Sequence, residues 1–551
     1  MKLNITLEDG KIISIEKGST FKDIIEMYYK EDMKNIALCT LNDKYYELVR
    51  EVPESGELKR VHFDCDEGLN VYTRTLQFIF IKAALDIFKD SKITIEHSIS
   101  KGLFGEIHKE KILSEDDIKR IKERMKYLID IDLPINKIEV SKEKAIKVFK
   151  DYGMEDKVKL LTYMDFDTVK LYELDGRYDY FYGQMAYSTG VIKAWDLIKY
   201  NTGFILRSPR VEDLNTLPPY KEQKRLSSIF YETEKWLNIL GISDVGTLNE
   251  KIMENDLKDI VLVSEALHEK KFANIADNIS NKNGVKIVLI AGPSSSGKTT
   301  FANRLSIQLR VNGFHPIPLS LDDYFVDREF SPRDENGEYD FESIYSLDLE
   351  TLNNHLEKLL NGEEVEIPTY NFMKGKREWL GHKVKLPQNG VLIVEGIHAL
   401  NPVLTNLIDD KYKYKIYISA LTQLNLDNHN RIPTTDVRKI RRIVRDYLSR
   451  GYGGEDTLSM WPSIKRGEKK NIFIYQEEAD EMFNSTLVYE LCVLKPYALK
   501  ELNKISKDSP VYNEASRLIS FLNFFKEIPM DKVPENSILR EFIGGSCFYK
   551  Y

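Results

Sequence analysis

The sequence predicts an α/β protein: a parallel sheet with helices in the C-terminal half, preceded by two smaller α+β modules. Short, almost wholly apolar runs at 285–290, 316–320 and 390–394 are typical of strands buried on both faces of a parallel sheet. A helical pattern at 300–310 follows the first of these runs. Near the N-terminus, apolar and polar residues instead alternate, which is typical of half-exposed strands in a hairpin.

The composition bounds the class of protein. The chain has 551 residues, 42% of them hydrophobic, which predicts three or more domains. A net charge of -8 argues against a general nucleic-acid coater but leaves a local basic patch open. The four cysteines include no CxxC pair, so no disulfide framework or thiolate zinc site is expected. No signal-peptide pattern appears, and Lys82 and Asp86 interrupt the most apolar helical stretch, so we expect a soluble cytoplasmic protein.

Residues 1–63 are predicted to form a small module. Alternation at 3–7 and a turn at 9–10 predict a hairpin, and Thr20 with Asp23 predicts a helix that starts with a capping box. A hairpin, a helix and further short strands suggest a ubiquitin-like α+β fold. The segment resembles a TGS domain, the module at the N-terminus of threonyl-tRNA synthetases.

Residues 64–210 are predicted to be mixed α/β. His97-Ser-Ile-Ser-Lys101, a helix at 113–130 that starts at Ser114, and the sequence YSTG at 187–190 together resemble the second domain of threonyl-tRNA synthetases. In that family two His-containing pairs form an editing site. The resemblance leaves His97 and puts Lys101, Phe181 and Met185 at the other three positions, so we expect no metal or hydrolytic chemistry there and interpret His97 as structural or a relic.

The remaining boundaries follow from composition. We predict a helical connector at 211–280, a nucleotide-binding domain at 281–505, and a C-terminal helix and tail at 506–551.

The sequence GPSSSGKT at 292–299 lies between a predicted strand and a predicted helix, the context that a GxxxxGK[ST] phosphate-binding loop (P-loop) requires. Glycines let backbone N–H groups face phosphate oxygens, and the helix N-terminus adds partial positive charge. Lys298 would reach the β- and γ-phosphates and Thr299 would ligate Mg²⁺. A chance turn is the alternative, and the strand and helix argue against it. The predicted nucleotide-binding residues here are Gly292, Ser294, Ser295, Ser296, Gly297, Lys298, Thr299 and Thr300.

Carboxylates follow the next two predicted strands. Asp322 and Asp323 could accept a proton from an attacking hydroxyl, and Glu395 could contact Mg²⁺ directly or through water. Ordinary acidic turns after strands are the alternative. Asp340 could bind two vicinal hydroxyls of a sugar.

Two further motifs suit a substrate and a lid. The aromatic residues of IPTYNF at 367–372 suit a flat base, although packing within a lid is an equal reading. Helical spacing in DVRKIRRIVRD at 436–446 brings several arginines onto one face, where they could stabilise a migrating phosphoryl group. A solvated face or an RNA-binding helix are the alternatives.

The ordered motifs GPSSSGKTT, SLDDYF, YDF, IPTYNF, VLIVEGI and DVRKIRRIVRD, over about 284–500, resemble the uridine kinase branch of the phosphoribulokinase/uridine kinase family. The resemblance implies catalytic roles for Lys298 and for Asp322 as general base. It implies that Thr299, Glu395 and Asp322 surround Mg²⁺, and that Arg441 and Arg445 bind nucleotide phosphates. The implied substrate-binding residues are Asp340, Tyr324, Tyr370, Phe372 and Arg438.

The chain departs from the family pattern at two positions of the acceptor pocket. Asn371 replaces an aspartate, and Gly375 stands where family members have a histidine, unless Lys374 or Lys376 compensates. We expect transfer of phosphate from ATP (or another NTP), with Mg²⁺, to the 5′-hydroxyl of uridine or cytidine, as in pyrimidine salvage. Left open are another hydroxylated metabolite as acceptor, a nucleotide- or RNA-responsive regulatory protein on a kinase fold, RNA binding by the N-terminal half, and a homo-oligomer.

Overall fold

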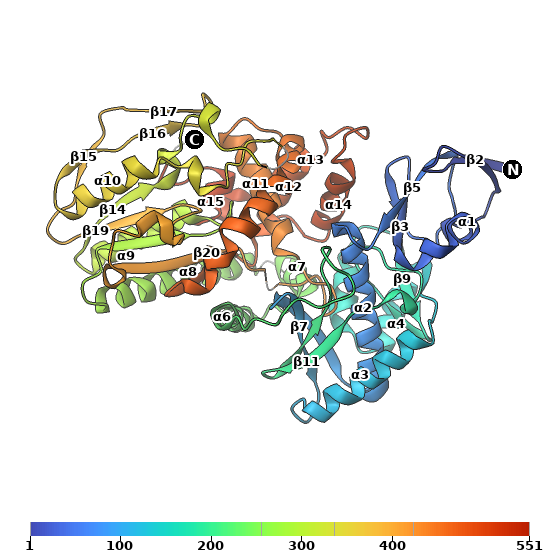
Figure 1. The fold of residues 1–551 in the computed structure, drawn as a ribbon. Coiled ribbons are helices and arrows are strands. Elements are labelled where there is room, and N and C mark those ends of the chain that lie inside the picture. Colours follow the sequence, from blue (N-terminus) through green and yellow to red (C-terminus); the bar gives the residue numbers. More distant parts are fainter. Residues whose placement is uncertain (1, 255, 335–336, 423, 550–551) are drawn as a thin grey trace. The chain divides into compact units, whose positions relative to one another are not determined.

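The computed structural model describes residues 2–254, 256–334, 337–422 and 424–549. The ends of the predicted N- and C-terminal modules, Met1 and 550–551, lie outside the described residues. The chain forms two compact units (Figure 1). Unit 1 comprises 1–223, 244–247 and 425–431, and unit 2 comprises 224–243, 248–424 and 432–551.

The N-terminal part of unit 1 has the predicted ubiquitin-like fold. A five-stranded sheet with the order β2-β1-β5-β3-β4 packs against α1, and β1 pairs in parallel with β5. The Thr20–Asp23 capping box is present at the start of α1. The elements are β1 (Lys2–Thr6), β2 (Ile12–Glu16), α1 (Phe21–Tyr28), β3 (Ile36–Leu41), β4 (Lys44–Tyr46) and β5 (Gly56–His62).

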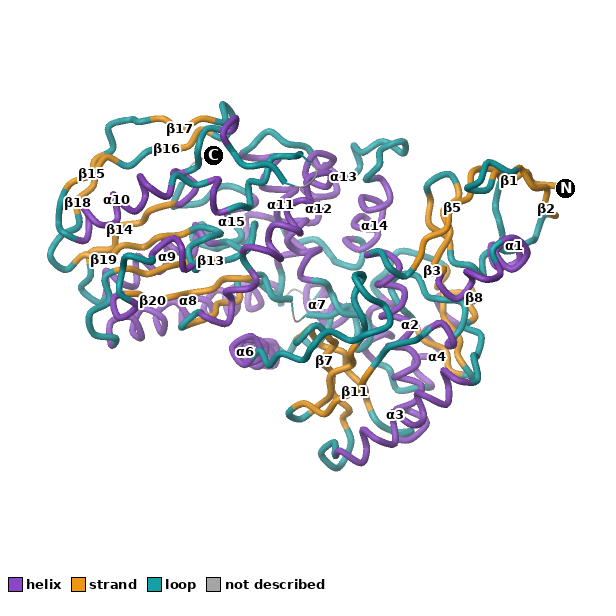
Figure 2. Tube along the Cα trace, viewed as in Figure 1, coloured by secondary structure: helices purple, strands orange, loops and turns teal. Residues whose placement is uncertain are grey.

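The rest of unit 1 is built on two antiparallel sheets, β11-β12-β7-β6 and β10-β9-β8 (Figure 2). The long helix α2 is buried over most of its length, and α3 packs on it. The helix α3 starts after Ser114, as expected, and Ser114 and Asp117 form a capping box there. The elements are α2 (Asp66–Ile87), β6 (Lys92–Ile99), β7 (Gly102–His108), α3 (Glu115–Asp130), β8 (Asn136–Ser141), α4 (Lys142–Asp151), α5 (Glu155–Thr162), β9 (Thr168–Leu174), β10 (Arg177–Asp179), β11 (Asp196–Tyr200) and β12 (Gly203–Arg207).

Unit 2 contains the predicted parallel sheet. Its five strands have the order β14-β19-β13-β20-β21, all pairs are parallel, and the strand before the phosphate loop is central. The residues of β13 and the last five of β19 are buried, as their apolar sequences predict. The strands are β13 (Ile287–Ala291), β14 (His315–Ser320), β19 (Gly390–Glu395), β20 (Lys413–Ser419) and β21 (Glu481–Asn484).

Helices cover this sheet, and two small hairpins extend from it (Figure 1). The helix α9 packs on β14, β19 and α8, while α11 packs on α12, α13 and α15. The helices are α6 (Lys224–Leu240), α7 (Val245–Met253), α8 (Leu257–Asn281), α9 (Lys298–Val311), α10 (Leu349–Leu360), α11 (Thr434–Ser449), α12 (Gly454–Asn471), α13 (Glu490–Leu502), α14 (Tyr512–Leu522) and α15 (Arg540–Ile543). The hairpins are β15 (Glu364–Glu366) with β18 (Lys383–Lys385), and β16 (Thr369–Asn371) with β17 (Lys376–Glu378).

The predicted connector at 211–280 does not form a module of its own. Its helices α6 and α8 pack on each other, and α6 packs on β21, so both belong to unit 2. Residues 425–431, which lie within the predicted nucleotide-binding domain at 281–505, are part of unit 1.

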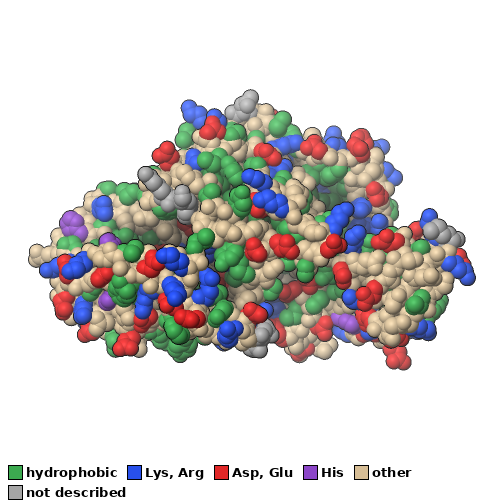
Figure 3. Space-filling model, turned by 90° about the horizontal axis from the view of Figure 1, so that it is seen from above, with side chains coloured by type: hydrophobic (Ala, Val, Ile, Leu, Met, Phe, Trp, Pro, Cys, Tyr) green, Lys and Arg blue, Asp and Glu red, His purple; other side chains and the backbone are tan. Residues whose placement is uncertain are grey.

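The described part of the chain has no helix that is long and apolar enough to cross a membrane. On the face seen in Figure 3, acidic and basic side chains are intermingled.

Candidate active site

The phosphate loop, Gly292–Thr299, connects β13 to α9. Gly297 has a φ of +85°, the left-handed region that glycine adopts at little cost. A Cβ atom on Gly292 would lie 2.1 Å from the Ile418 carbonyl oxygen, so only glycine fits there. The Ser295 and Ser296 hydroxyls are buried and have no hydrogen-bond partner among the described residues. A loop that combines unpartnered hydroxyls with a helix N-terminus fits an anionic ligand.

Lys298 lies where several carboxylates exert their charge on it. Burial lowers the pKa of its ammonium group, while Glu395, Asp322 and Glu541 act in the opposite direction. Its Nζ donates to the Pro293 carbonyl oxygen at 3.2 Å. The lysine is therefore a positive charge at the loop, balanced by three acids from distant parts of the sequence.

Glu395 ends β19 and is close to the phosphate loop. The Thr299 hydroxyl donates to Glu395 Oε1 at 3.3 Å, and the Ser320 hydroxyl donates to the same oxygen at 2.9 Å. Burial, followed by the charge of Asp322, raises the pKa of Glu395 to about 7. Carboxylate and hydroxyl oxygens are the donors that Mg²⁺ prefers, so Thr299, Glu395 and Asp322 fit the metal predicted here.

Asp322 and Asp323 lie in the 3₁₀ turn Leu321–Tyr324 at the carboxyl end of β14. Asp323 accepts a hydrogen bond from the Tyr370 backbone N–H at 3.1 Å, and burial raises its pKa to about 6. Asp322 is half-buried, and its charge acts on both Lys298 and Glu395. Of the two acids, Asp322 is thus the one associated with the phosphate loop, whereas Asp323 supports the β16–β17 hairpin.

Asp340 lies beside a buried carboxyl group that sequence reasoning missed. Its Oδ1 accepts from the Glu342 N–H at 3.2 Å. Burial, with the nearby charge of Glu468, raises the pKa of Glu342 to about 7, and Arg442 and Lys298 oppose this shift. No motif marked Glu342 or Glu468, because neither follows a strand of the sheet.

Tyr370 and Phe372 form an aromatic wall on the β16–β17 hairpin. Their ring centroids are 5.1 Å apart in an edge-on arrangement, and Phe372 is 38% exposed. The Arg450 guanidinium lies over the Phe372 ring at 4.8 Å. Sequence reasoning missed Arg450, which comes after the motif at 436–446.

Tyr324 differs from our prediction. It is fully buried, and its hydroxyl is 3.0 Å from His355 Nδ1 on α10. A tyrosine packed in the core toward α10 is not part of an acceptor surface, so we remove it from the substrate-binding set.

Gly375 has a physical reason for not being a histidine. Its φ is +66°, and a Cβ atom there would lie 2.9 Å from the Arg328 Nε. Arg328 also donates from Nη2 to the Phe372 carbonyl oxygen at 2.8 Å. Any larger residue at 375 would therefore disturb Arg328, which, like Arg450, is a cation beside the aromatic wall.

The arginines of α11 contact the phosphate loop and are themselves paired with acids. Arg438 donates from Nε to the Ser294 carbonyl oxygen at 3.0 Å and forms an ion pair with Glu468. Arg442 donates to the Ser294 hydroxyl at 2.7 Å. The start of the loop is thus held from α11 by direct contacts.

Two other arginines of this helix were predicted to bind nucleotide. Arg441 is fully buried, pairs with Glu490 at 2.6 Å and donates to the Ser295 carbonyl oxygen at 3.3 Å. Arg445 pairs with Asp446 at 2.8 Å, and its charge acts on Lys298. The geometry of Arg441 is that of a residue that supports the loop from behind, which differs from a lid.

Of the four editing-like positions in unit 1, only position 97 holds a histidine. Phe181 and Met185 are buried, and His97 packs on Phe104 with ring centroids 4.8 Å apart. Burial lowers the pKa of His97 to about 3, so its ring stays neutral. Lys101 lies in the turn between β6 and β7 with a φ of +63°.

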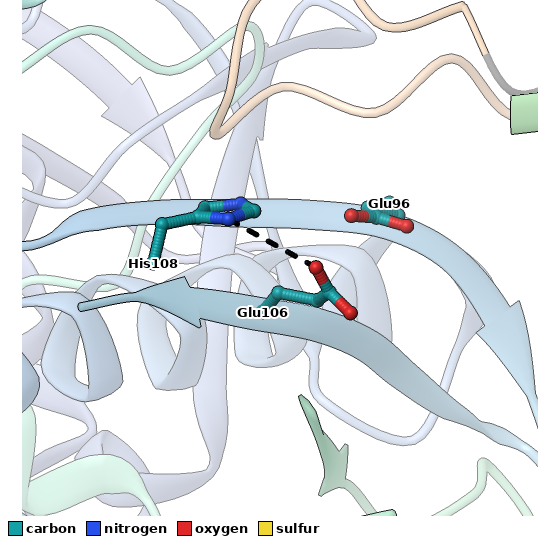
Figure 4. Close-up of side chains that lie close together, drawn as sticks. All are labelled: Glu96, Glu106 and His108. Carbon is teal, nitrogen blue, oxygen red and sulfur yellow. Dashed lines mark ion pairs between the residues drawn. The ribbon is translucent and has the colours of Figure 1, made fainter. Parts of the chain in front are cut away.

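Among the described residues of unit 1, one group of side chains has ligand atoms close enough together to hold a metal ion. Glu96, Glu106 and His108 lie together on β6 and β7 (Figure 4). Neighbouring hydroxyls already bind this group: Thr94 Oγ1 is 3.1 Å from both Glu96 Oε1 and His108 Nε2. A cross-strand hydrogen-bond network accounts for the arrangement, and we assign no metal to it.

Comparison with known proteins finds different relatives for the N-terminal and C-terminal parts of the chain. Residues 287–488 match the model of the Phosphoribulokinase / Uridine kinase family. The N-terminal region is similar to Threonine--tRNA ligase of Syntrophotalea carbinolica, with 30% identity over 197 residues, 35% of this chain and 31% of that protein. It is also similar to Threonine--tRNA ligase of Bacillus velezensis, with 28% identity over 240 residues, 40% of this chain and 37% of that protein. The matches span about a third of the length of these relatives.

Solved structures also resemble parts of the chain. One is titled a possible uridine kinase from Bacillus stearothermophilus, with 20% identity, a TM-score of 0.27, and coverage of 39% of this chain and 98% of that one. Another is D-glycerate 3-kinase from Cryptococcus neoformans, with 14% identity, a TM-score of 0.19, and coverage of 53% of this chain and 88% of that one. The protein thus joins an N-terminal region that is similar to threonine–tRNA ligases to a region, 287–488, that matches the model of the Phosphoribulokinase / Uridine kinase family.

Proposed function

We propose that this chain transfers the γ-phosphoryl group of ATP to the 5′-hydroxyl of a pyrimidine ribonucleoside. One observation carries the proposal: Lys298, Thr299, Glu395 and Asp322 meet at the phosphate loop, at the carboxyl ends of three adjacent strands. Ligands of open α/β sheets bind at this edge.

Each residue has a role that follows from its chemistry. Lys298 and the loop amides bind the β- and γ-phosphates of ATP. Asp322 accepts the proton of the acceptor hydroxyl as the hydroxyl oxygen bonds to the γ-phosphorus, the bond to the β–γ bridging oxygen breaks, and ADP leaves. A Mg²⁺ ion held by Thr299, Glu395 and Asp322 would supply positive charge to the phosphate oxygens. Glu395 and Ser320 share a hydrogen bond that orients the carboxylate.

The acceptor side is assembled from two segments. Asp340 would hold the ribose hydroxyls, and Tyr370 and Phe372 would flank the base. Arg438 would act by holding the phosphate loop. Arg445 would act by stabilising the negative charge of the migrating phosphoryl group. The family match and the exposed ring of Phe372 support this assignment.

A specific observation favours a second class of acceptor. Arg328 lies beside the aromatic wall, in contact with the Phe372 carbonyl oxygen. A guanidinium there suits an acceptor with an anionic group, such as a sugar phosphate, as well as the carbonyls of a pyrimidine.

A panel of acceptors tests the proposal. The full chain is assayed with ATP and Mg²⁺ against uridine, cytidine, purine nucleosides, and hydroxylated sugars and sugar phosphates. Turnover of a pyrimidine ribonucleoside alone supports the first proposal. Turnover of sugar phosphates without nucleosides would replace it with the second.

The role of Asp322 as general base is tested by substitution. Asp322→Asn is expected to lower kcat by about 10²- to 10⁴-fold because it removes the proton acceptor, while ADP affinity stays close to that of the wild type. Asp323→Asn is the matched variant, and its effect should fall mainly on the KM for the acceptor, because Asp323 supports the hairpin. Loss of kcat in Asp323→Asn alone would assign the base to Asp323.

A further inference from the structure

The C-terminal segment 538–549 packs directly on the phosphate loop. A Cβ atom on Gly297 would lie 2.7 Å from Ile538 Cγ2, so the backbone of the loop and this side chain are in close contact. Phe542 lies under the Arg441 guanidinium at 4.9 Å. The segment is therefore fixed to both the loop and the helix α11 that supports the loop.

A carboxylate from this segment binds the first turn of α9. Glu541 Oε2 accepts from the Thr300 backbone N–H at 3.1 Å and from the Thr300 hydroxyl at 2.9 Å. The Tyr549 hydroxyl is 2.6 Å from the same Thr300 oxygen. Thr300 is fully buried and Glu541 is 6% exposed, so these contacts are shielded from solvent.

The N–H groups of a first helical turn have no partner within the helix, and a phosphate loop uses them to bind phosphate oxygens. In this structure the Thr300 N–H is bound to a carboxylate instead. Its single hydrogen cannot serve the carboxylate and a phosphate at full strength at once. A negative carboxylate beside the loop would also repel a nucleotide.

The charges around Lys298 point the same way. Glu395, Asp322 and Glu541 all act on this one lysine. Glu395 and Asp322 face the proposed metal site, where a cation would offset their charge. Glu541 instead bonds to the helix amide, where a polyphosphate would add further negative charge.

We propose that Glu541 occupies the Thr300 N–H as a stand-in for a phosphate oxygen, so that segment 538–549 and the nucleotide compete for the phosphate loop. The docked segment is a resting state, and nucleotide binding requires Glu541 to withdraw. This inference rests on the nucleotide-binding part of the proposed function and is independent of the acceptor.

The first test measures ADP affinity by calorimetry on the full chain. Glu541→Gln removes the charge and should tighten ADP binding by about fivefold to tenfold. Tyr549→Phe removes one hydrogen bond of the docked segment and should tighten it by about twofold. Glu527→Gln is the matched control, because Glu527 is exposed and lies outside the docked segment 538–549; its ADP affinity should equal that of the wild type.

A second measurement uses the unmodified chain, so it does not depend on the folding of a variant. Hydrogen exchange of residues 538–549 should become faster when ADP is added, because the segment leaves the loop. Slower exchange with ADP, or weaker ADP binding by Glu541→Gln, would overturn the inference and make Glu541 part of the nucleotide site. ADP binding is measured without an acceptor, so a chain that binds ADP but phosphorylates no nucleoside would contradict only the acceptor assignment.

Discussion

Glu342 shows how a single residue can report the electrostatic state of the site. Burial and the charge of Glu468 raise its pKa to about 7, above the ordinary value of 4.5. The folded protein therefore holds this proton more tightly than the unfolded chain does. The resulting stabilisation is fully present below about pH 4.5 and is lost as the pH rises through about 7.

Glu342→Gln makes this group permanently neutral. When the pH rises from 6 to 8, the unfolding free energy of the wild type should fall by about 1 kcal/mol more than that of the variant. Urea denaturation at the two pH values measures the difference. Glu357→Gln, an exposed change on α10, should follow the wild-type profile. Parallel profiles for Glu342→Gln and the wild type would mean that Glu342 ionises normally.

At the scale of an element, the β16–β17 hairpin depends on one glycine. Gly375 combines a φ of +66° with a close approach to Arg328, and its carbonyl oxygen accepts from the Arg328 N–H at 2.9 Å. Gly375→Ala should destabilise the chain by about 1–2 kcal/mol through the left-handed backbone and should raise the KM for the acceptor by displacing Arg328. Thermal unfolding and steady-state kinetics measure the two effects.

The control variant Gly381→Ala separates the effect of backbone strain from the effect of the contact with Arg328. Gly381 has a φ of +77°, and no atom lies within 4 Å of a Cβ built on it. The control should therefore show a similar loss of stability with an unchanged KM. Equal KM values for both variants would show that Arg328 has no part in acceptor binding.

At the scale of the whole molecule, unit 1 contains residues 425–431, which come about 200 residues after the rest of that unit. Asp427 pairs with Lys157 at 2.9 Å, and Lys157 also pairs with Asp179 at 3.1 Å. All three side chains are fully buried. His429 lies 2.7 Å from Asp179, and Ile95 donates its N–H to the Asn428 carbonyl oxygen at 2.8 Å.

Lys157→Met would leave two carboxylates buried without their cation. We expect a loss of about 3–5 kcal/mol in the stability of unit 1, because unpaired buried charges are costly. Lys144→Met, an exposed change on α4, is the matched control and should cost little. Thermal unfolding of the full chain measures the effect, and limited proteolysis shows whether cleavage within 1–223 and 425–431 becomes faster. Similar melting curves for both variants would contradict the role given to this ion cluster.

Local patterns predicted much of this structure. Strand, loop and helix at 285–311 follow from apolar runs and from the spacing of the phosphate loop, and the residues at Thr20 and Ser114 located two helix starts. The approach of Asp322 to Glu395 follows from the geometry of parallel strands, which end at one edge of the sheet. The family match at 287–488 and the similarity to threonine–tRNA ligases confirm the resemblances.

The sequence alone did not predict contacts between distant parts of the chain. Thr300 and Glu541 are 241 residues apart, and no spacing rule joins them. The burial of Tyr324 depends on α10, and the conformation of Gly375 depends on Arg328. The placement of 425–431 in unit 1 depends on packing that its polar sequence does not indicate.

The position of 425–431 has a consequence for where this chain can be divided. A gene divided after codon 223 would leave Asp427 and His429 in one product and their partners Lys157 and Asp179 in the other. The two halves therefore cannot be separated at residue 223 without separating these buried partners. Unit 1 is therefore complete only when the chain extends as far as residue 431.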